Sequence, residues 1–300
     1  MNATENSGTR RLFGRARRAE AMLVAVTAVW GLTFSLVKES LNEISPFVFM
    51  SFRFWLAFVL VALFCVGRMH KVDRGLLKAG FLLGLLLFIA YAFQTFGLKY
   101  TSAGNAGFIT GLFVVFVPVL SALMLGQRPD KASTVAIIVA VVGLGFLSLQ
   151  SGLRVNGGDL MVLACAFALS LHIIYMDRYV KEYDLMLLTL LQMGVLALGN
   201  TAAGLVFEGF AWPGGRLVWT TIIVCGVFAS AIAFYVQGYA QRVLSPIRTS
   251  MVLIMEPVFS VLFGIILLGE TLTWRGWLGC GLILSGMVLT EIVPYVQRES

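Results

Sequence analysis

Runs of about 20 apolar residues recur along the whole sequence and are separated by short polar links. That length crosses the hydrocarbon core of a bilayer as an α-helix, and no polar link is long enough to form a soluble domain. Hydrophobic residues make up 59% of the 300 residues and charged residues only 12%, about half the charged fraction of a soluble domain. The sequence therefore predicts an all-α integral membrane protein.

The polar links divide the chain into ten expected transmembrane helices. These spans lie at about residues 20–38, 46–67, 75–98, 103–126, 132–150, 158–178, 184–207, 216–241, 245–268 and 273–294. A basic cytoplasmic segment is expected over residues 1–19 and a cytoplasmic tail over 295–300. We expect the spans to form two five-helix repeats, over residues 20–150 and 151–294, around a central cavity.

The basic residues, which give a formal net charge of +7, sit in the links and do not form one continuous face. Membrane topology explains them better than nucleic-acid binding, and we expect no nucleic-acid partner. Most of them fall in links on the same side of the membrane as the N-terminus, so the positive-inside rule predicts that both termini are cytoplasmic. The cysteines lie far apart within apolar runs, and we expect no disulfide, metal site or cofactor.

An internal repeat appears when the chain is aligned with itself so that Tyr91 meets Phe234. In that register, Gln94 also meets Gln237, Gly126 meets Gly269, and Gly143 meets Gly286. Five spans per repeat is an odd number, so the second repeat must enter the membrane inverted. Inverted repeats are typical of transporters that work by alternating access, although a duplication without mechanistic use is an alternative.

Four stretches resemble the drug/metabolite transporter superfamily, and within it the EamA-type exporters. They are AVWGLTFSLVK at residues 28–38, SFRFWLAFVLVAL at 51–63, GLKYTSAGNAGFIT at 97–110, and MEPVFSVLFGIILLGETLTWRGWLGCGLILSG at 255–286. The chain looks particularly similar to YddG-like bacterial amino-acid exporters. The resemblance implies a basket of ten helices, a cavity lined mainly by spans one, three, four, six, eight and nine, and export of small metabolites. The repeats have diverged, because Gly126-Gln127 replaces the Gly-Glu pair and no arginine in the second repeat matches Arg53.

Two charged residues, Arg53 and Glu256, fall within the expected hydrocarbon depth, where a charge costs roughly 2.5 to 3.5 kcal/mol on insertion scales. Thr249, Glu256 and Ser260 recur at helical spacing and are expected to form one cavity wall. Glu256 is either a protonatable or cation-facing group, or a structural carboxylate beside a kink. Arg53 is interpreted as a structural charge that snorkels or pairs with Glu39 or Glu43.

Two prolines within the spans, Pro118 and Pro257, each free a backbone carbonyl, and both are candidate hinges. Shaping of the helix basket is the alternative role for these prolines.

Further candidate substrate-binding residues are polar or aromatic side chains inside the spans, and helix packing explains each of them nearly as well. They are Trp30, Thr33 and Phe34 in span one, Tyr91, Gln94 and Thr95 in span three, Asn105 in span four, His172 and Tyr175 in span six, and Phe234 and Gln237 in span eight. The paired glutamines offer donors and acceptors to an amino-acid ligand, and the aromatic rings can stack a ligand or hold an ammonium group.

The sequence thus predicts a secondary transporter in the bacterial inner membrane that exports amino acids, with aromatic ones as candidates, or similar small metabolites. The alternatives are an exporter of drugs, purines or sugars, an integral membrane enzyme or lipid scramblase, or a membrane scaffold. No catalytic motif is recognisable, so an enzyme is not expected. The expected partners are a small-molecule substrate and the lipid bilayer, with the chain as a monomer or a homodimer.

Overall fold

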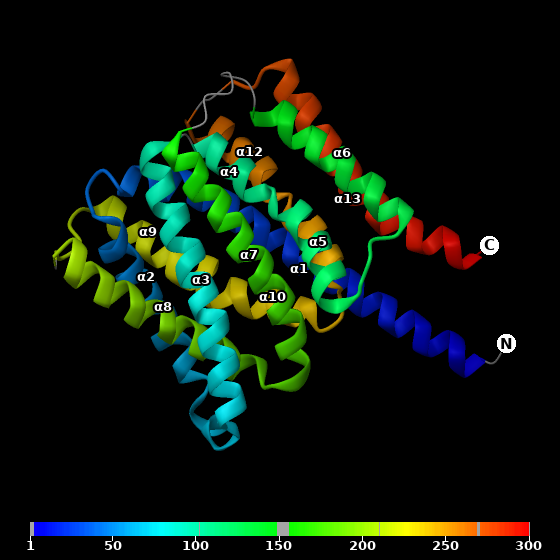
Figure 1. Cartoon of the computed structure of the whole chain (residues 1–300), viewed down its shortest axis with the longest axis horizontal. Coiled ribbons are helices and arrows are strands. Elements are labelled where there is room, and N and C mark those ends of the chain that lie inside the picture. The colour runs from blue at the N-terminus through cyan, green and yellow to red at the C-terminus, as the bar shows by residue number, and fades with distance from the viewer. Residues whose placement is uncertain (1–2, 102, 149–155, 210, 269–270, 300) are drawn as a thin grey trace.

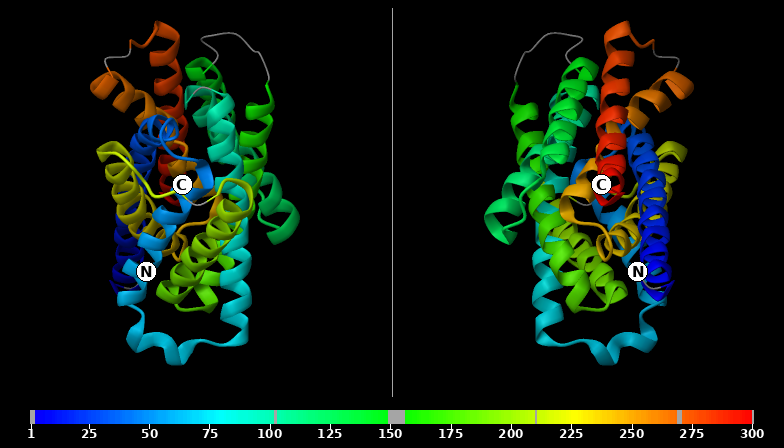
Figure 2. Two further views of the ribbon diagram at one scale, coloured as in Figure 1. Left: turned by 90° about the vertical axis from the view of Figure 1, so that its left-hand side faces the viewer. Right: turned by 90° about the vertical axis from the view of Figure 1, so that its right-hand side faces the viewer.

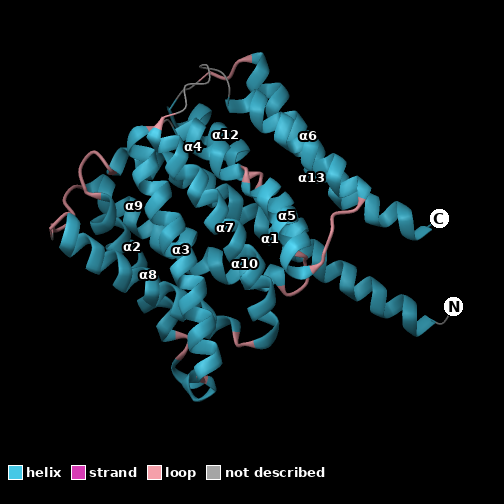
Figure 3. Cartoon of the chain, viewed as in Figure 1, coloured by secondary structure: helices cyan, strands magenta, loops and turns pink. Residues whose placement is uncertain are grey.

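The computed structural model describes the backbone of the chain except at residues 1–2, 102, 149–155, 210, 269–270 and 300. Side chains are described except at residues 1–13, 102–105, 147–155, 210, 267–270 and 290–300. The described part contains helices and loops only (Figure 3). Its elements are α1 (Ala3–Ser40), α2 (Pro46–Leu63), η1 (Val66–Lys71), α3 (Arg74–Tyr100), α4 (Ala103–Gly111), α5 (Phe113–Leu125), α6 (Lys131–Ser148), α7 (Gly157–Glu182), α8 (Leu185–Phe207), α9 (Arg216–Gly226), η2 (Val227–Ile232), α10 (Ala233–Gln241), α11 (Pro246–Leu253), α12 (Glu256–Leu268) and α13 (Trp274–Glu299).

These helices build the ten expected membrane passes. Eight passes within the described residues are long and apolar enough to cross a bilayer, formed by α1, α2, α3, α4 with α5, α7, α8, α9 with α10, and α11 with α12. Shorter apolar stretches in α6 and α13 provide the other two. The structure thereby confirms the all-α membrane fold with two halves of five passes each.

Both ends of the chain lie on one side of the bundle, at the right of Figure 1, as an even number of passes requires. We call this the terminal side. The views in Figure 2 show the short η1 segment at the base of the molecule, leading into the long α3. Since successive passes alternate in direction, η1 and the link between α7 and α8 also belong to the terminal side.

Three of the described passes are interrupted within the membrane. The first is the α4–α5 pass, which breaks at Leu112, and the second is the α11–α12 pass, which breaks at Ile254 and Met255. At both breaks the backbone forms a tighter turn, with Leu112 N donating to Ile109 O and Met255 N donating to Val252 O, each at 3.1 Å. In the register of the repeat Leu112 matches Met255 and Ile109 matches Val252, so the two halves break at the same place. The third interruption is the π-helical segment η2 between α9 and α10.

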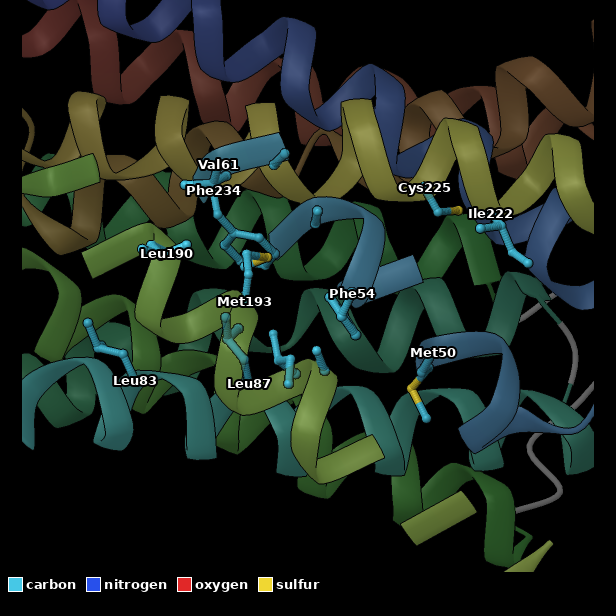
Figure 4. Packing of buried hydrophobic residues seen from close by; sticks show 14 of the residues in the cluster. Met50, Phe54, Val61, Leu83, Leu87, Leu190, Met193, Ile222, Cys225 and Phe234 are labelled. Carbon is cyan, nitrogen blue, oxygen red and sulfur yellow. The ribbon is translucent and has the colours of Figure 1, made fainter. Parts of the chain in front are cut away.

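The main hydrophobic core lies where α2, α3 and α8 meet α10 (Figure 4). Phe54 of α2, Leu87 of α3, Met193 of α8 and Phe234 of α10 are all buried there. Outside this core, α6 packs along α13, as Figure 1 shows, and both helices contribute to a second hydrophobic cluster with α5 and α11. The passes broken at Leu112 and Met255 lie between these two regions and contact each other through α4 with α12 and α5 with α11.

Candidate substrate cavity

A cavity lies between the interrupted passes, and the empty space inside it and at its opening together measures about 760 Å³. Its walls come from α1, α2, α3, α5, α7, α10, α11 and α12. The lining residues are Trp30, Thr33, Phe34, Val37, Arg53, Ala90, Tyr91, Gln94, Thr95, Leu98, Phe113, Cys165, Leu169, His172, Ile173, Phe234, Gln237, Leu253 and Glu256. Polar and aromatic residues from both halves of the chain therefore face one space.

Most of the candidate residues from the sequence meet at this cavity. Those that line it are Trp30, Thr33, Phe34, Tyr91, Gln94, Thr95, His172, Phe234, Gln237 and Glu256. Phe234 links the aromatic members, since its ring centroid lies 5.7 Å from that of Trp30, 6.2 Å from Tyr91 and 5.9 Å from His172. These four rings come from four different passes and form one continuous aromatic wall.

Three expected lining residues, Tyr175, Thr249 and Ser260, lie elsewhere. The three residues Thr249, Glu256 and Ser260 do not form one cavity wall, because the helix break between Leu253 and Glu256 separates Thr249 from the other two. Thr249 is completely buried in α11. Ser260 packs against α1, where its backbone N would lie 2.7 Å from a Cβ placed on Gly31.

Tyr175 is also outside the cavity lining, because it lies nearer the terminal end of α7 than His172 does. There it stacks on Tyr179 with a centroid distance of 6.1 Å and an interplanar angle of 17°.

The remaining residues named from the sequence are one candidate binding residue and two candidate hinge prolines, in spans four and nine. Asn105 belongs to α4, but its side chain is outside the described residues. Pro118 lies inside α5, and the break in this pass occurs at Leu112, so Pro118 does not mark the interruption. Pro257 is the second residue of α12, a position where its missing N–H and fixed φ suit the start of a helix.

Arg53 does not make the contacts expected from the sequence. Its side chain is only 4% exposed and lines the cavity, and Glu39 and Glu43 are not its partners. The Nε atom donates to Ser230 Oγ at 2.9 Å, and Nη2 donates to Tyr91 Oη and to the Ala229 carbonyl, both at 3.4 Å. Because α2 packs along η2, the guanidinium group is turned into the bundle and away from the membrane surface.

The π-helical segment η2 is central to this geometry. A π-helical turn shifts the backbone hydrogen bonds by one residue and leaves a carbonyl available to side chains, and such turns occur often at functional sites. Here the Ala229 carbonyl accepts from Trp30 Nε1 at 2.9 Å as well as from Arg53. Composition and periodicity contain no signal for this local change, so the sequence did not indicate it.

Glu256 is the first residue of α12 and is 9% exposed on the cavity wall. The N-terminus of a helix carries partial positive charge, which favours a carboxylate at this position. Among the described residues no side chain or backbone group forms a hydrogen bond or ion pair with the Glu256 carboxylate. The carboxylate is therefore available to a ligand in the cavity.

The amide side chains on the cavity wall are partly engaged. Gln94 donates to Thr110 Oγ1 at 3.3 Å, and Gln237 donates to Gln241 Oε1 at 3.1 Å. The imidazole of His172 lies 2.7 Å, through Nε2, from the Oε1 atom of the buried Gln192. These contacts hold the side chains in fixed positions around the cavity.

The cavity extends from the breaks toward the side opposite the termini, where Val37 and Leu98 lie near the ends of α1 and α3. On the terminal side the passes are in contact. Gln241 donates to the Ile173 carbonyl at 2.7 Å, and Arg248 forms an ion pair with Glu20. These contacts join α10 to α7 and α11 to α1, and they close the terminal side.

Several apolar lining residues were not anticipated from the sequence. They are Val37, Ala90, Leu98, Phe113, Cys165, Leu169, Ile173 and Leu253. Apolar side chains face lipid, core and cavity alike, so residue type alone does not distinguish the three locations.

Comparison with known proteins agrees with this architecture. The profile of the EamA-like transporter family matches the chain twice, at residues 17–149 and 156–292. A crystal structure of another protein superposes with a TM-score of 0.77 and 19% identity over 92% of this chain and 98% of the other, which is a likeness of fold.

Relatives along nearly the full length carry transporter names. The chain is 32% identical to an "Uncharacterized transporter" of Archaeoglobus fulgidus over 95% of this chain and 88% of the relative. It is 26% identical to the "Uncharacterized inner membrane transporter YedA" of Escherichia coli K12 over 91% and 90% of the two chains. Two profile matches, one to each half, and these full-length similarities show that this chain belongs to the EamA-like transporter family.

Proposed function

We propose that the chain is a secondary transporter that exports amino acids, including aromatic ones, or similar small metabolites from the cytoplasm by alternating access. The observation that carries this proposal is one cavity, lined from both halves, that combines four aromatic rings with two glutamines and an available carboxylate. The resemblance to YddG-like exporters and the inner-membrane name of the Escherichia coli relative support the substrate class and the location.

The asymmetry of the cavity supports alternating access. With the termini in the cytoplasm, as the positive-inside rule predicts, the structure corresponds to an outward-facing state. The two repeats, over residues 20–150 and 151–294, exchange conformations to give the inward-facing state. The equivalent breaks at Leu112 and Met255 supply the two positions at which such a change is absorbed.

The proposal is tested with purified protein in liposomes and each proteinogenic amino acid in radiolabelled form. We expect flux of at least one amino acid above that of protein-free vesicles, down its concentration gradient. No flux of any amino acid would remove amino acids from the proposal.

A pair of matched variants connects this flux to the cavity. Gln94→Leu removes an amide from the cavity wall, whereas Gln127→Leu changes the same residue type at an exposed position after α5. We expect a reduced flux only for Gln94→Leu. Equal flux for both variants would argue against this cavity as the transport site.

A further inference from the structure

We infer that Arg53 binds the carboxylate of the transported molecule and that, together with Glu256, it restricts the substrate to zwitterions with a free carboxylate and a free ammonium group. This inference rests on the proposed transport function and specifies its substrate class. The interpretation of Arg53 as a structural charge is thereby replaced by a role in substrate selection.

The hydrogen bonds of Arg53 leave part of the guanidinium group unused. A guanidinium group has five N–H donors, one on Nε and two on each Nη. Ser230 accepts from Nε, while Tyr91 and Ala229 accept long bonds from Nη2. No described residue accepts a hydrogen bond from Nη1. A carboxylate in the cavity would fill this position, because a guanidinium group binds carboxylates through two neighbouring donors.

The charge of Arg53 also has no protein counterion. No carboxylate lies within ion-pairing distance of Arg53 among the described side chains, although the residue is nearly buried in the bundle. Its guanidinium carbon lies 4.7 Å from the Tyr91 ring centroid and 5.0 Å from that of Phe54. Aromatic faces stabilise a cation only in part, and charges at this depth normally pair or face a hydrated cavity. An anionic group of the ligand completes the site.

Glu256 supplies the opposite charge on the same cavity. It forms no ion pair with Arg53, and no other described side chain pairs with it. A ligand with a single charge would leave one of the two residues unpaired in a buried site, which is costly. A zwitterion satisfies both, with its carboxylate at Arg53 and its ammonium group at Glu256, while the aromatic wall contacts the side chain.

The two charges also give the ligand one orientation. In the register of the repeat, Arg53 corresponds to Leu196, which is completely buried in α8. The second half therefore provides no equivalent cation. The bound zwitterion keeps its carboxylate near α2 and its ammonium group near α12, whichever side of the bundle is open.

The first test uses the wild-type protein in liposomes and needs no variant. Flux of labelled L-phenylalanine and L-leucine is competed with the free amino acids, with their C-terminal amides, and with 3-phenylpropionate, which lacks the ammonium group. We expect the amides and 3-phenylpropionate to compete roughly tenfold to a hundredfold less well, the range for one charged hydrogen-bonding group. Equal competition by the amides would overturn the carboxylate site while leaving amino-acid transport intact.

The second test asks whether Arg53 causes the preference for a free carboxylate over an amide. We expect Arg53→Gln to lose most of the discrimination between amino acid and amide, and Arg53→Lys to retain part of it. Arg275→Gln removes the same charge at an exposed position of α13 and should keep the wild-type discrimination. A folded Arg53→Gln protein, judged by its elution and melting temperature, that still prefers the free carboxylate would overturn the inference. If this variant does not fold, the competition measured on the wild type decides.

The outcomes separate this inference from the proposed function. Absence of flux for every amino acid removes amino acids from the transport proposal, and with them the zwitterion site. Flux that is insensitive to the carboxylate contradicts only the role of Arg53.

Discussion

Gly143 of α6 and Gly286 of α13 make the same close contact with the opposite helix. A Cβ placed on Gly143 would lie 2.8 Å from Gly279 O, and one placed on Gly286 would lie 2.7 Å from Ala136 O. Ala136 and Gly279 match each other in the register of the repeat, as do the two glycines. The two helices therefore exchange equivalent contacts about a local two-fold axis, which is the packing expected of two duplicated halves.

This contact predicts that side chains are not tolerated at either glycine. Gly143→Ala and Gly286→Ala each place a methyl group against backbone atoms, and we expect each to lower the stability of the detergent-solubilised protein by about 1 to 3 kcal/mol. Gly281→Ala is the matched control in α13, because nothing lies within 4 Å of its added Cβ. Thermal unfolding of the three variants checks this prediction, and equal melting temperatures would contradict the close packing.

The ion pair between Glu20 and Arg248 predicts how the terminal side opens. Glu20→Arg replaces attraction with repulsion between α1 and α11, so we expect Ile173→Cys to react faster with a charged thiol reagent added on the terminal side. The increase should be about twofold to fivefold, as is typical of a partly exposed ion pair.

The background for this experiment lacks the four native cysteines, all of which are free thiols. Adding Arg248→Glu restores opposite charges and should return the labelling rate toward its original value. A rate that is indifferent to both changes would exclude the ion pair from closing the cavity.

We predict that Glu256 makes transport responsive to a proton gradient. Glu256→Gln keeps the size of the side chain but can neither bind nor release a proton. We expect this variant to lose stimulation by an imposed proton gradient. It should still exchange labelled for unlabelled substrate across the vesicle membrane, but more slowly, because its neutral amide cannot form an ion pair with the ammonium group of the substrate. Unchanged flux at all pH values, with the gradient response intact, would show that Glu256 is structural and that coupling lies elsewhere.

Asp184 lies at the start of α8 on the terminal side, where it both caps the helix and pairs with basic side chains. Its Oδ1 atom accepts from Met186 N and Leu187 N, and its Oδ2 atom accepts from Arg68 and Lys71. Burial raises the pKa of Asp184, but the hydrogen bond from Arg68 and the remaining contacts outweigh this, and the pKa falls below the ordinary value of 3.8.

A folded-state pKa below the unfolded value means that Asp184 stabilises the protein above its ordinary pKa, and that this contribution is lost as the pH falls through the folded value. We expect Asp184→Ala to cost about 1 kcal/mol at neutral pH, the usual cost of a lost N-cap, and Asp184→Asn to cost less. The stability lost in Asp184→Ala should become smaller as the pH falls toward about 3. Glu182→Gln at an exposed i,i+4 pair is the control, with stability followed by thermal unfolding across pH. A loss that did not change with pH would exclude the charge of Asp184.

The covalent order of apolar and polar residues was sufficient to predict the ten passes and the repeat. Helices inside a membrane must satisfy their own backbone hydrogen bonds, so span length and number follow from hydropathy alone. Helical periodicity in the sequence predicted the wrong neighbours where a helix is interrupted. Thr249 and Glu256 appear on one face of an ideal helix, but the turn at Ile254 and Met255 separates them.

The order of residues alone was enough to establish that this chain spans a membrane, that its two halves are related, and that Glu256 and Arg53 are costly enough to need an explanation. Only the tertiary structure shows that both charges face one cavity and that Arg53 donates a hydrogen bond to Ser230 in a π-helical turn. Hydrophobicity fixes the depth of a residue in the membrane. The direction of a side chain around its helix depends instead on the packing of neighbouring passes, to which residues far apart in the sequence contribute.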